Sequence, residues 1–229
     1  MGSRAGSFRT PSNEMRVRQR GPAYTAGMGG KIDLRQMLVK GKHALDPAQV
    51  CAVTAIVLAE PRRARRLIEL LWDENPGVAN RAGDVLERIS RAPSDSVARL
   101  LGEFKEPLLG LLPEATPRKL RWNLALIAPR LPLTRLEARR AATALQTYIE
   151  DPASLVKTCG ITGLAGLARH DPALLPAVLD QLRLFSRSGT AAMRARCRIL
   201  LKDFERQAGK PNPHPASHIQ SKGQTTPYI

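Results

Sequence analysis

Apolar residues recur at the same helical offsets in four segments of this chain, and these segments follow one another at nearly constant spacing. In the segment that begins at Val78, the residues 4, 7, 8 and 11 positions later are also apolar, as on the buried face of a helix. The first residues of the four stripes lie 42, 36 and 37 residues apart; they are Val78, Leu120, Val156 and Met193. A recurrence with this period predicts an array of stacked helical repeats.

The composition fits closely packed helices. Hydrophobic residues make up 43% of the chain but aromatic residues only 4%, so the apolar content is mostly Ala, Leu, Val and Ile. No apolar run approaches the roughly 18 residues of a membrane span, so we expect no membrane association. Cys51, Cys159 and Cys197 form no CxxC or CxxxH pair. We therefore expect buried, reduced thiols in a cytoplasmic protein.

Helix starts are marked by a capping residue followed by proline, or by a capping box. The side-chain oxygen of the first residue can accept a hydrogen bond from a backbone amide of the first helical turn. Proline is tolerated at the next position because a backbone N–H there would have no partner within the helix. Thr134 and Glu137 have the spacing of a capping box. The capping pairs are Asp46-Pro47, Asn75-Pro76, Thr116-Pro117, Asp151-Pro152 and Asp171-Pro172. Together the signals predict nine helices, near 47–59, 61–73, 76–91, 94–112, 117–130, 134–149, 152–169, 172–186 and 190–207.

Proline and glycine residues inside these helices predict two further features of the fold. Pro107 should kink or split the helix near 94–112, because proline removes a backbone hydrogen bond. Gly160, Gly163 and Gly166 lie at helical spacing and follow no predicted strand. They predict close helix packing rather than a phosphate loop.

The charge is unevenly distributed along the chain. The formal net charge is +16, with nine Lys/Arg against two acids in residues 1–45, 25 against 18 in residues 46–207, and two lysines in residues 208–229. We expect a basic disordered tail over 1–45, a helical array over 46–207 and a disordered tail over 208–229, where prolines and polar residues cannot sustain a helix. The charge favours an acidic partner of some kind.

Residues 75–207 resemble HEAT repeats. The resemblance lies in the Asn-Pro or Asp-Pro pairs that open helices, and in a basic residue directly after the first stripe position in three of four helices: Arg121, Lys157 and Arg194. It implies an all-α fold, a right-handed α-solenoid of about four to five HEAT-like helical hairpins over 46–207. An armadillo-like array is a close variant. Such a fold implies an extended binding face and usually no catalysis.

Arginines in the second helix of each predicted hairpin are the candidate binding residues. Several lie in first helical turns, where they oppose the helix dipole, so an anionic ligand such as phosphate would favour them. If second helices line one face, the arginines could form a basic track. Alternatively, they are solvated or paired with Glu69, Glu103, Glu137 and Asp180. The candidates are Arg62, Arg63, Arg66, Arg99, Arg135, Arg139 and Arg183.

Three functions remain open at this point. The first is a non-enzymatic scaffold or adaptor that binds an acidic protein partner through its inner helical face. The second is a solenoid that binds nucleic acid without reading sequence. The third resembles HEAT-like alkylpurine DNA glycosylases, which use tryptophans and an acidic residue; Trp72 beside Asp73 and Trp122 beside Arg121 are the residues available. The HEAT-like deoxyhypusine hydroxylases bind di-iron through His-Glu pairs, which this sequence lacks. We expect no catalytic residue, no metal and no small-molecule cofactor.

Overall fold

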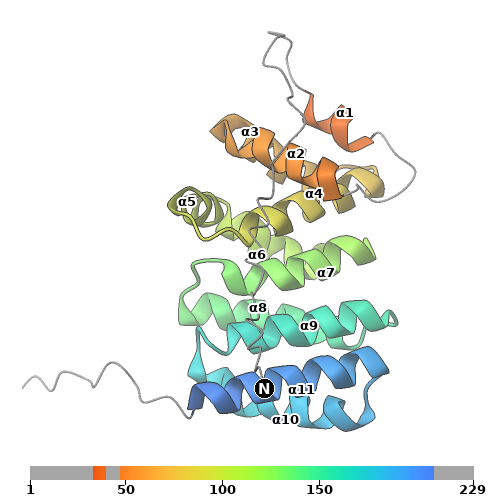
Figure 1. Cartoon of the computed structure of the whole chain (residues 1–229), viewed down its shortest axis with the longest axis vertical. Coiled ribbons are helices and arrows are strands. Elements are labelled where there is room, and N and C mark those ends of the chain that lie inside the picture. The colour runs from red at the N-terminus through yellow and green to blue at the C-terminus, as the bar shows by residue number, and fades with distance from the viewer. Residues whose placement is uncertain (1–32, 40–46, 209–229) are drawn as a thin grey trace, which may run out of the picture. The chain divides into compact units, whose positions relative to one another are not determined.

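The computed structural model describes residues 33–39 and 47–208, and the regular structure in this part of the chain is helical (Figure 1). The helices stack in two rows. Row A contains α2 (Pro47–Leu58), α4 (Pro76–Ser90), α7 (Arg118–Ile127), α9 (Ser154–Leu167) and α11 (Ala191–Ala208). Row B contains α3 (Pro61–Glu69), α5 (Asp95–Glu103), α6 (Lys105–Glu114), α8 (Arg135–Ile149) and α10 (Leu175–Ser188). Short 3-10 turns follow α3 (η1, Leu70–Trp72) and α7 (η2, Ala128–Arg130) and precede α10 (η3, Pro172–Leu174).

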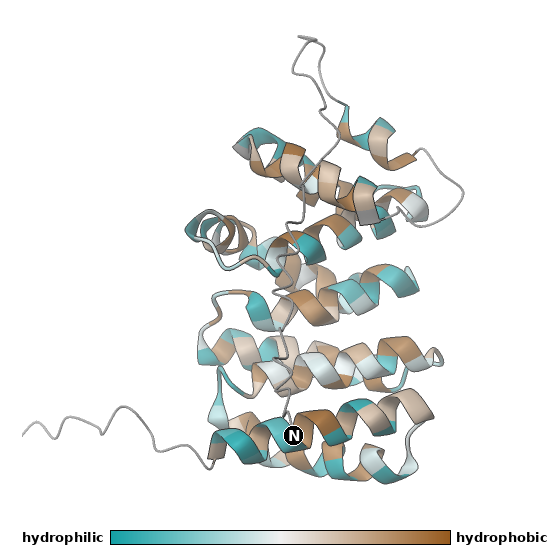
Figure 2. Cartoon of the chain, viewed as in Figure 1, coloured by the Kyte–Doolittle hydropathy of each residue, from teal (hydrophilic) through white to brown (hydrophobic). Residues whose placement is uncertain are grey.

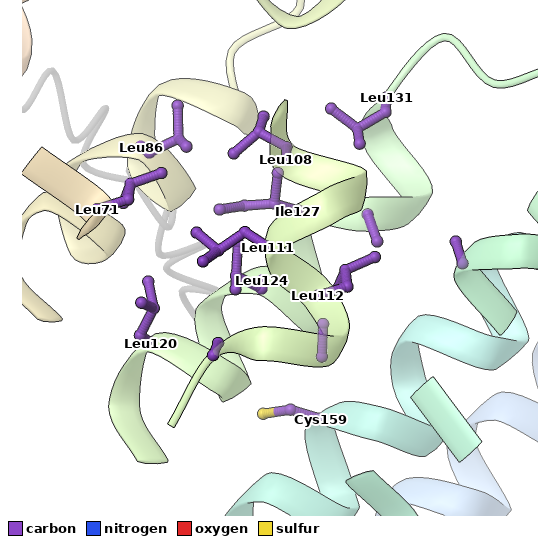
Figure 3. Packing of buried hydrophobic residues seen from close by; sticks show 14 of the residues in the cluster. Leu71, Leu86, Leu108, Leu111, Leu112, Leu120, Leu124, Ile127, Leu131 and Cys159 are labelled. Carbon is purple, nitrogen blue, oxygen red and sulfur yellow. The ribbon is translucent and has the colours of Figure 1, made fainter. Parts of the chain in front are cut away.

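Row A consists of α2 followed by the four stripe helices, and each packs on the next: α2 on α4, α4 on α7, α7 on α9, and α9 on α11. The stripes pack between the two rows as one continuous apolar core. Figure 3 shows its centre, where Leu86, Leu111, Leu120 and Leu124 from successive repeats meet. Most helices show both hydrophobic and hydrophilic residues, whereas α2 and α9 are largely apolar (Figure 2). The expected all-α solenoid of helical hairpins is confirmed.

Three of the predicted caps are present, at Asn75, Thr134 and Asp171. The side chain of Asn75 accepts a hydrogen bond from the Gly77 amide (2.8 Å). Ser94, which no proline follows, caps α5 in the same way by accepting from the Val97 amide (3.3 Å). The capping box at the start of α8 is present.

The Thr116 prediction is wrong, because α7 begins at Arg118 after Pro117 and no side chain caps it. Asp151 differs from expectation, because its carboxylate binds Arg121 and the Ala153 amide (2.7 Å), and α9 begins at Ser154. Asp46 lies outside the described residues.

Pro107 splits the predicted helix over 94–112 into two helices, as expected. The break falls at Phe104, whose backbone leaves the helical range (φ −104°, ψ 15°). Proline cannot donate to the carbonyl four residues earlier, which is that of Glu103 at the end of α5. The second helix of this repeat is therefore the pair α5 and α6.

The glycines of α9 allow close packing of helices, as predicted. A Cβ on Gly163 would collide with the Ala125 carbonyl oxygen of α7. A Cβ on Gly166 would lie 2.5 Å from the Cβ of Pro129. In both cases α9 approaches its neighbour so closely that only glycine fits.

The expected tail over 1–45 is wrong at its C-terminal end, because Leu34–Val39 form helix α1, which packs on α4. Leu34 and Leu38 are buried, one helical turn apart. Arg81 of α4 donates hydrogen bonds to the carbonyl oxygens of Leu38 and Val39. These carbonyls lie at the C-terminal end of α1, where the helix itself supplies no N–H donor for them. The rest of this expected tail, apart from Asp33, and residues 209–229 of the second tail lie outside the described residues.

Glu137 makes the fold sensitive to acid. Lys105 of α6 binds its carboxylate at 2.7 Å, and the Thr134 amide donates to it at 2.7 Å. These bonds, that of Lys105 above all, lower its pKa from 4.5 to about 2. A carboxylate whose pKa is depressed in the folded state stabilises that state above its unfolded pKa, and the contribution is lost as pH falls through the folded pKa.

We therefore expect Glu137→Gln to have a lower urea midpoint of unfolding than wild type at neutral pH. At about pH 3 the urea midpoints of the variant and the wild type should lie closer together. The control is Glu106→Gln, which removes an exposed carboxylate 3.9 Å from Arg140. It should change neither midpoint appreciably, since surface pairs contribute little. An equal loss at both pH values for Glu137→Gln would contradict the assignment.

Candidate functional site

The excess positive charge lies mainly on row A. Its helices, with η2, contain twelve Lys/Arg and four Asp/Glu, whereas the helices of row B contain eleven and seven. The candidate arginines chosen from the sequence all belong to row B, on α3, α5, α8 and α10. Row B, where the arginines are clustered in the sequence, therefore also has more acidic residues that offset their charge.

Four of the seven candidate arginines are already ion-paired. Arg66 binds Glu69 at 2.9 Å, and Arg183 binds Asp180 at 2.9 Å. The other two pairs are Arg63 with Glu60 and Arg139 with Asp171. The other three candidates are exposed and make no hydrogen bond or ion pair within the described ranges: Arg62, Arg99 and Arg135.

Opposite charges also connect neighbouring repeats along row B. Arg65 of α3 binds Glu103 of α5 at 3.0 Å, and Lys105 binds Glu137 as described above. At the turn before α10, Arg139 lowers the pKa of Asp171, and the charge of nearby Arg135 adds to this. Acids are therefore interleaved with the candidate arginines, and four of the seven would exchange an existing partner on binding an anion.

A groove of about 390 Å³ opens on row A across three consecutive helices. Helix α2 contributes two small residues, the end of α4 contributes four charged residues, and α7 contributes two polar and two apolar residues. The lining residues are Val50, Cys51, Asp84, Glu87, Arg88, Arg91, Lys119, Trp122, Asn123 and Leu126. They come from three repeats, so stacking alone brings them together.

The two carboxylates of the groove are neutralised by neighbouring residues. Asp84 binds the Lys119 ammonium at 2.5 Å and accepts from the Asn123 amide at 3.0 Å. Glu87 binds Arg91 (2.8 Å) and Arg130 (2.9 Å). The hydrogen bond that Arg91 donates to Glu87 raises the pKa of Arg91. These pairs leave the groove with little free negative charge.

Arg88 is the groove cation that has no carboxylate partner within the described residues. Its side chain is exposed, and the polar contact that it makes is a long one, 3.6 Å from Nη2 to the sulfur of Cys51. A thiol is a weak acceptor, so the guanidinium keeps its capacity to bind an anion. Arg88 therefore presents an available positive charge at the groove.

Trp122 supplies an apolar surface in the same groove. Its indole is partly exposed, and its Nε1 donates to Asn123 Oδ1 at 3.0 Å, which fixes the ring. Leu126, one turn later, extends this surface. A fixed indole beside a free guanidinium suits a ligand that offers both an apolar and an anionic group.

Exposed apolar residues continue along row A beyond the groove. Leu155 of α9 is 48% exposed and Ile199 of α11 is 52% exposed. Between them, the hydroxyls of Thr158 and Thr162 donate to carbonyls of their own helix, at 2.7 Å each. Further row A cations have no hydrogen bond or ion pair among the residues with described positions: Arg118, Lys157, Arg198 and Lys202.

The tryptophans and acid of the glycosylase hypothesis do not meet. Trp72 lies in η1 and does not line the row A groove. Asp73 is held by Arg35 of α1 at 2.6 Å, which lowers its pKa. Arg121 turns from the groove to Asp151, and its guanidinium lies 4.2 Å from the centre of the Tyr148 ring.

The cysteines and His170 occupy positions where they serve packing and hydrogen bonding within the fold. Burial raises the pKa of Cys159 to about 11 and also raises that of Cys197, so both thiols stay protonated, as expected for core residues. Cys51 is exposed at the groove, contrary to expectation, because its position on α2 faces solvent rather than row B. His170 binds the Pro129 carbonyl at 2.8 Å. Within 33–39 and 47–208, no three His, Cys, Asp or Glu residues lie together as a metal site.

No family model matches this chain, and no curated protein matches it. Among solved structures it is similar to a designed armadillo repeat protein, with 12% identity and a TM-score of 0.37 over 74% of this chain and 99% of that one. The helices whose positions are described also include none long and apolar enough to span a membrane. By the stacking of its own helices in two rows, the described part of the chain is an α-solenoid of helical hairpins.

Proposed function

We propose that this chain is a non-enzymatic scaffold that binds an acidic segment of a protein partner on the exposed face of row A. The observation that carries the proposal is the pairing pattern in the groove. Its carboxylates are paired with cations of the same chain, and Arg88, which lines the groove together with Trp122, has no carboxylate partner among the described residues. A peptide with an acidic side chain next to an apolar one satisfies both groups.

The rest of row A supports an extended partner rather than a small molecule. The apolar positions Leu126, Leu155 and Ile199 come from three successive helices. Cations without a partner in the described chain accompany them on the same helices, among them Arg118 and Lys157. An extended chain that crosses the helices would meet one apolar contact and one cation per repeat. The free thiols fit a reducing compartment, and we place the protein in the cytoplasm.

The test is a fluorescence-anisotropy titration of the full chain with a labelled peptide of Glu, Leu and Gly. The same peptide with Gln in place of Glu and a single-stranded DNA of equal charge serve as the other probes. We expect the acidic peptide to bind best, with Leu contributing as well as charge. Tighter binding of DNA, with a steep decrease as salt is raised, would favour nucleic acid instead.

A further inference from the structure

The C-terminal end of the helix stack has a groove of about 640 Å³, larger than the groove on row A. Its lining comes from the end of α9 (Ala168 and Arg169), from the start of α10 with the turn before it, and from the C-terminal half of α11. Helices α10 and α11 are the two at that end of the described stack (Figure 1). Its apolar lining includes Leu175, Leu179, Leu201 and Phe204, all partly exposed. In a repeat array such a surface is covered by the next repeat, or a polar capping repeat replaces it. Here these four residues pack on the core of their own chain, with the Arg169 guanidinium 5.4 Å from the centre of the Phe204 ring, and each of them stays partly exposed.

Charges on α11 are arranged symmetrically around this lining. Arg198, Leu201 and Glu205 are spaced by three and four residues, so they share one stripe of the helix. Both charged residues are exposed, and neither makes a hydrogen bond or ion pair in the described part of the chain. The stripe therefore has a cation at one end, an anion at the other and a leucine between them.

The charges of this stripe are complementary to those of an identical stripe that runs in the opposite direction. If a second α11 packs antiparallel across a two-fold axis midway between Leu201 and Lys202, Arg198 and Glu205 lie equally far from the axis. Arg198 of each copy then faces Glu205 of the other, which gives two reciprocal ion pairs. Such reciprocity is the requirement for a two-fold symmetric interface.

We propose that the C-terminal end face binds a second copy of this chain, with the two α11 helices antiparallel. The ion pairs flank Leu201 and Phe204, which the second copy covers. Because α11 belongs to row A, the dimer has two row A faces joined at one interface. The inference does not require row A to bind a peptide, but the dimer engages Arg198, one of the row A cations named above.

Sedimentation velocity of the full chain over a concentration series tests the proposal. The 25.1-kDa chain should approach twice that mass as concentration rises. Arg198→Glu and Glu205→Arg should each weaken dimerisation by roughly tenfold or more, because each places like charges opposite one another. The double variant Arg198→Glu/Glu205→Arg should restore it, since both pairs re-form with exchanged partners.

The control swap is Arg66→Glu/Glu69→Arg on α3, an exposed pair 2.9 Å apart at the other end of the array. It should dimerise as wild type does, and circular dichroism should show all variants folded. A wild type that stays monomeric at every concentration, as it would if residues 209–229 of its own chain covered the groove, overturns the proposal. So does a double swap no better than the single variants, or single variants that dimerise normally.

Discussion

Gly163→Ala is expected to destabilise the protein by roughly 3 kcal/mol, the upper end of the cost of an overpacked core. The new methyl group would lie 2.7 Å from the Leu145 Cδ1 and against the Ala125 carbonyl oxygen. The carbonyl belongs to the backbone of α7, so the clash is relieved only if α9 moves away from its neighbour. Urea unfolding followed by circular dichroism measures the loss.

The matched control is Gly110→Ala in the middle of α6. A Cβ there meets nothing within 4 Å. Alanine is the better helix former by about 1 kcal/mol, so this variant should be slightly more stable than wild type. Equal stabilities of Gly163→Ala and Gly110→Ala would show that α7 and α9 are not in close contact.

Asp151→Ala is expected to cost roughly 2–3 kcal/mol, because it leaves a partly buried arginine without its carboxylate. The Asp151 side chain is 3% exposed and that of Arg121 is 19% exposed. The guanidinium of Arg121 stacks on Tyr148, whose hydroxyl donates to the Leu112 carbonyl of α6 at 2.6 Å. The substitution therefore disturbs a contact chain that runs through α6, α7 and α8.

The comparison variant is Asp180→Ala, which removes an exposed carboxylate paired with Arg183 three residues later. Its cost should stay below about 0.5 kcal/mol, as is usual for surface pairs. Thermal unfolding of both variants distinguishes a buried network from a surface one. If the two melt within a degree or so of each other, Asp151 does not hold Arg121 in place.

Local signals made the helices predictable. Caps such as Asn75 and Ser94 act within three residues, and the effect of Pro107 reaches only the preceding turn. Helix α1 was missed because its stability depends on Arg81, more than 40 residues away, and because basic residues surround its short apolar stripe. No local pattern indicates such a partner.

The site was harder to predict than the fold, since its charges are compensated across repeats. The acid that pairs with Arg139 is Asp171, 32 residues later. Counting arginines in one helix therefore overstated the charge of row B. The sequence did not single out Arg88. It is a candidate because, once the helices are stacked, it has no carboxylate partner among the described residues, and that depends on the tertiary structure. Trp122 was visible in the sequence, but its place beside Arg88 depends on the contact of α4 with α7.

The measurement that tests the central claim most directly compares Arg88→Glu with Arg183→Glu in binding the labelled acidic peptide. Both variants lower the net charge from +16 by the same amount, one on row A and one on row B. Because Arg88→Glu loses a charge-assisted contact, it should bind the peptide roughly tenfold or more weakly than wild type. Arg183→Glu should bind the peptide with an affinity close to that of wild type. Equal weakening of both would show that only overall charge matters, and a larger loss for Arg183→Glu would place the binding face on row B.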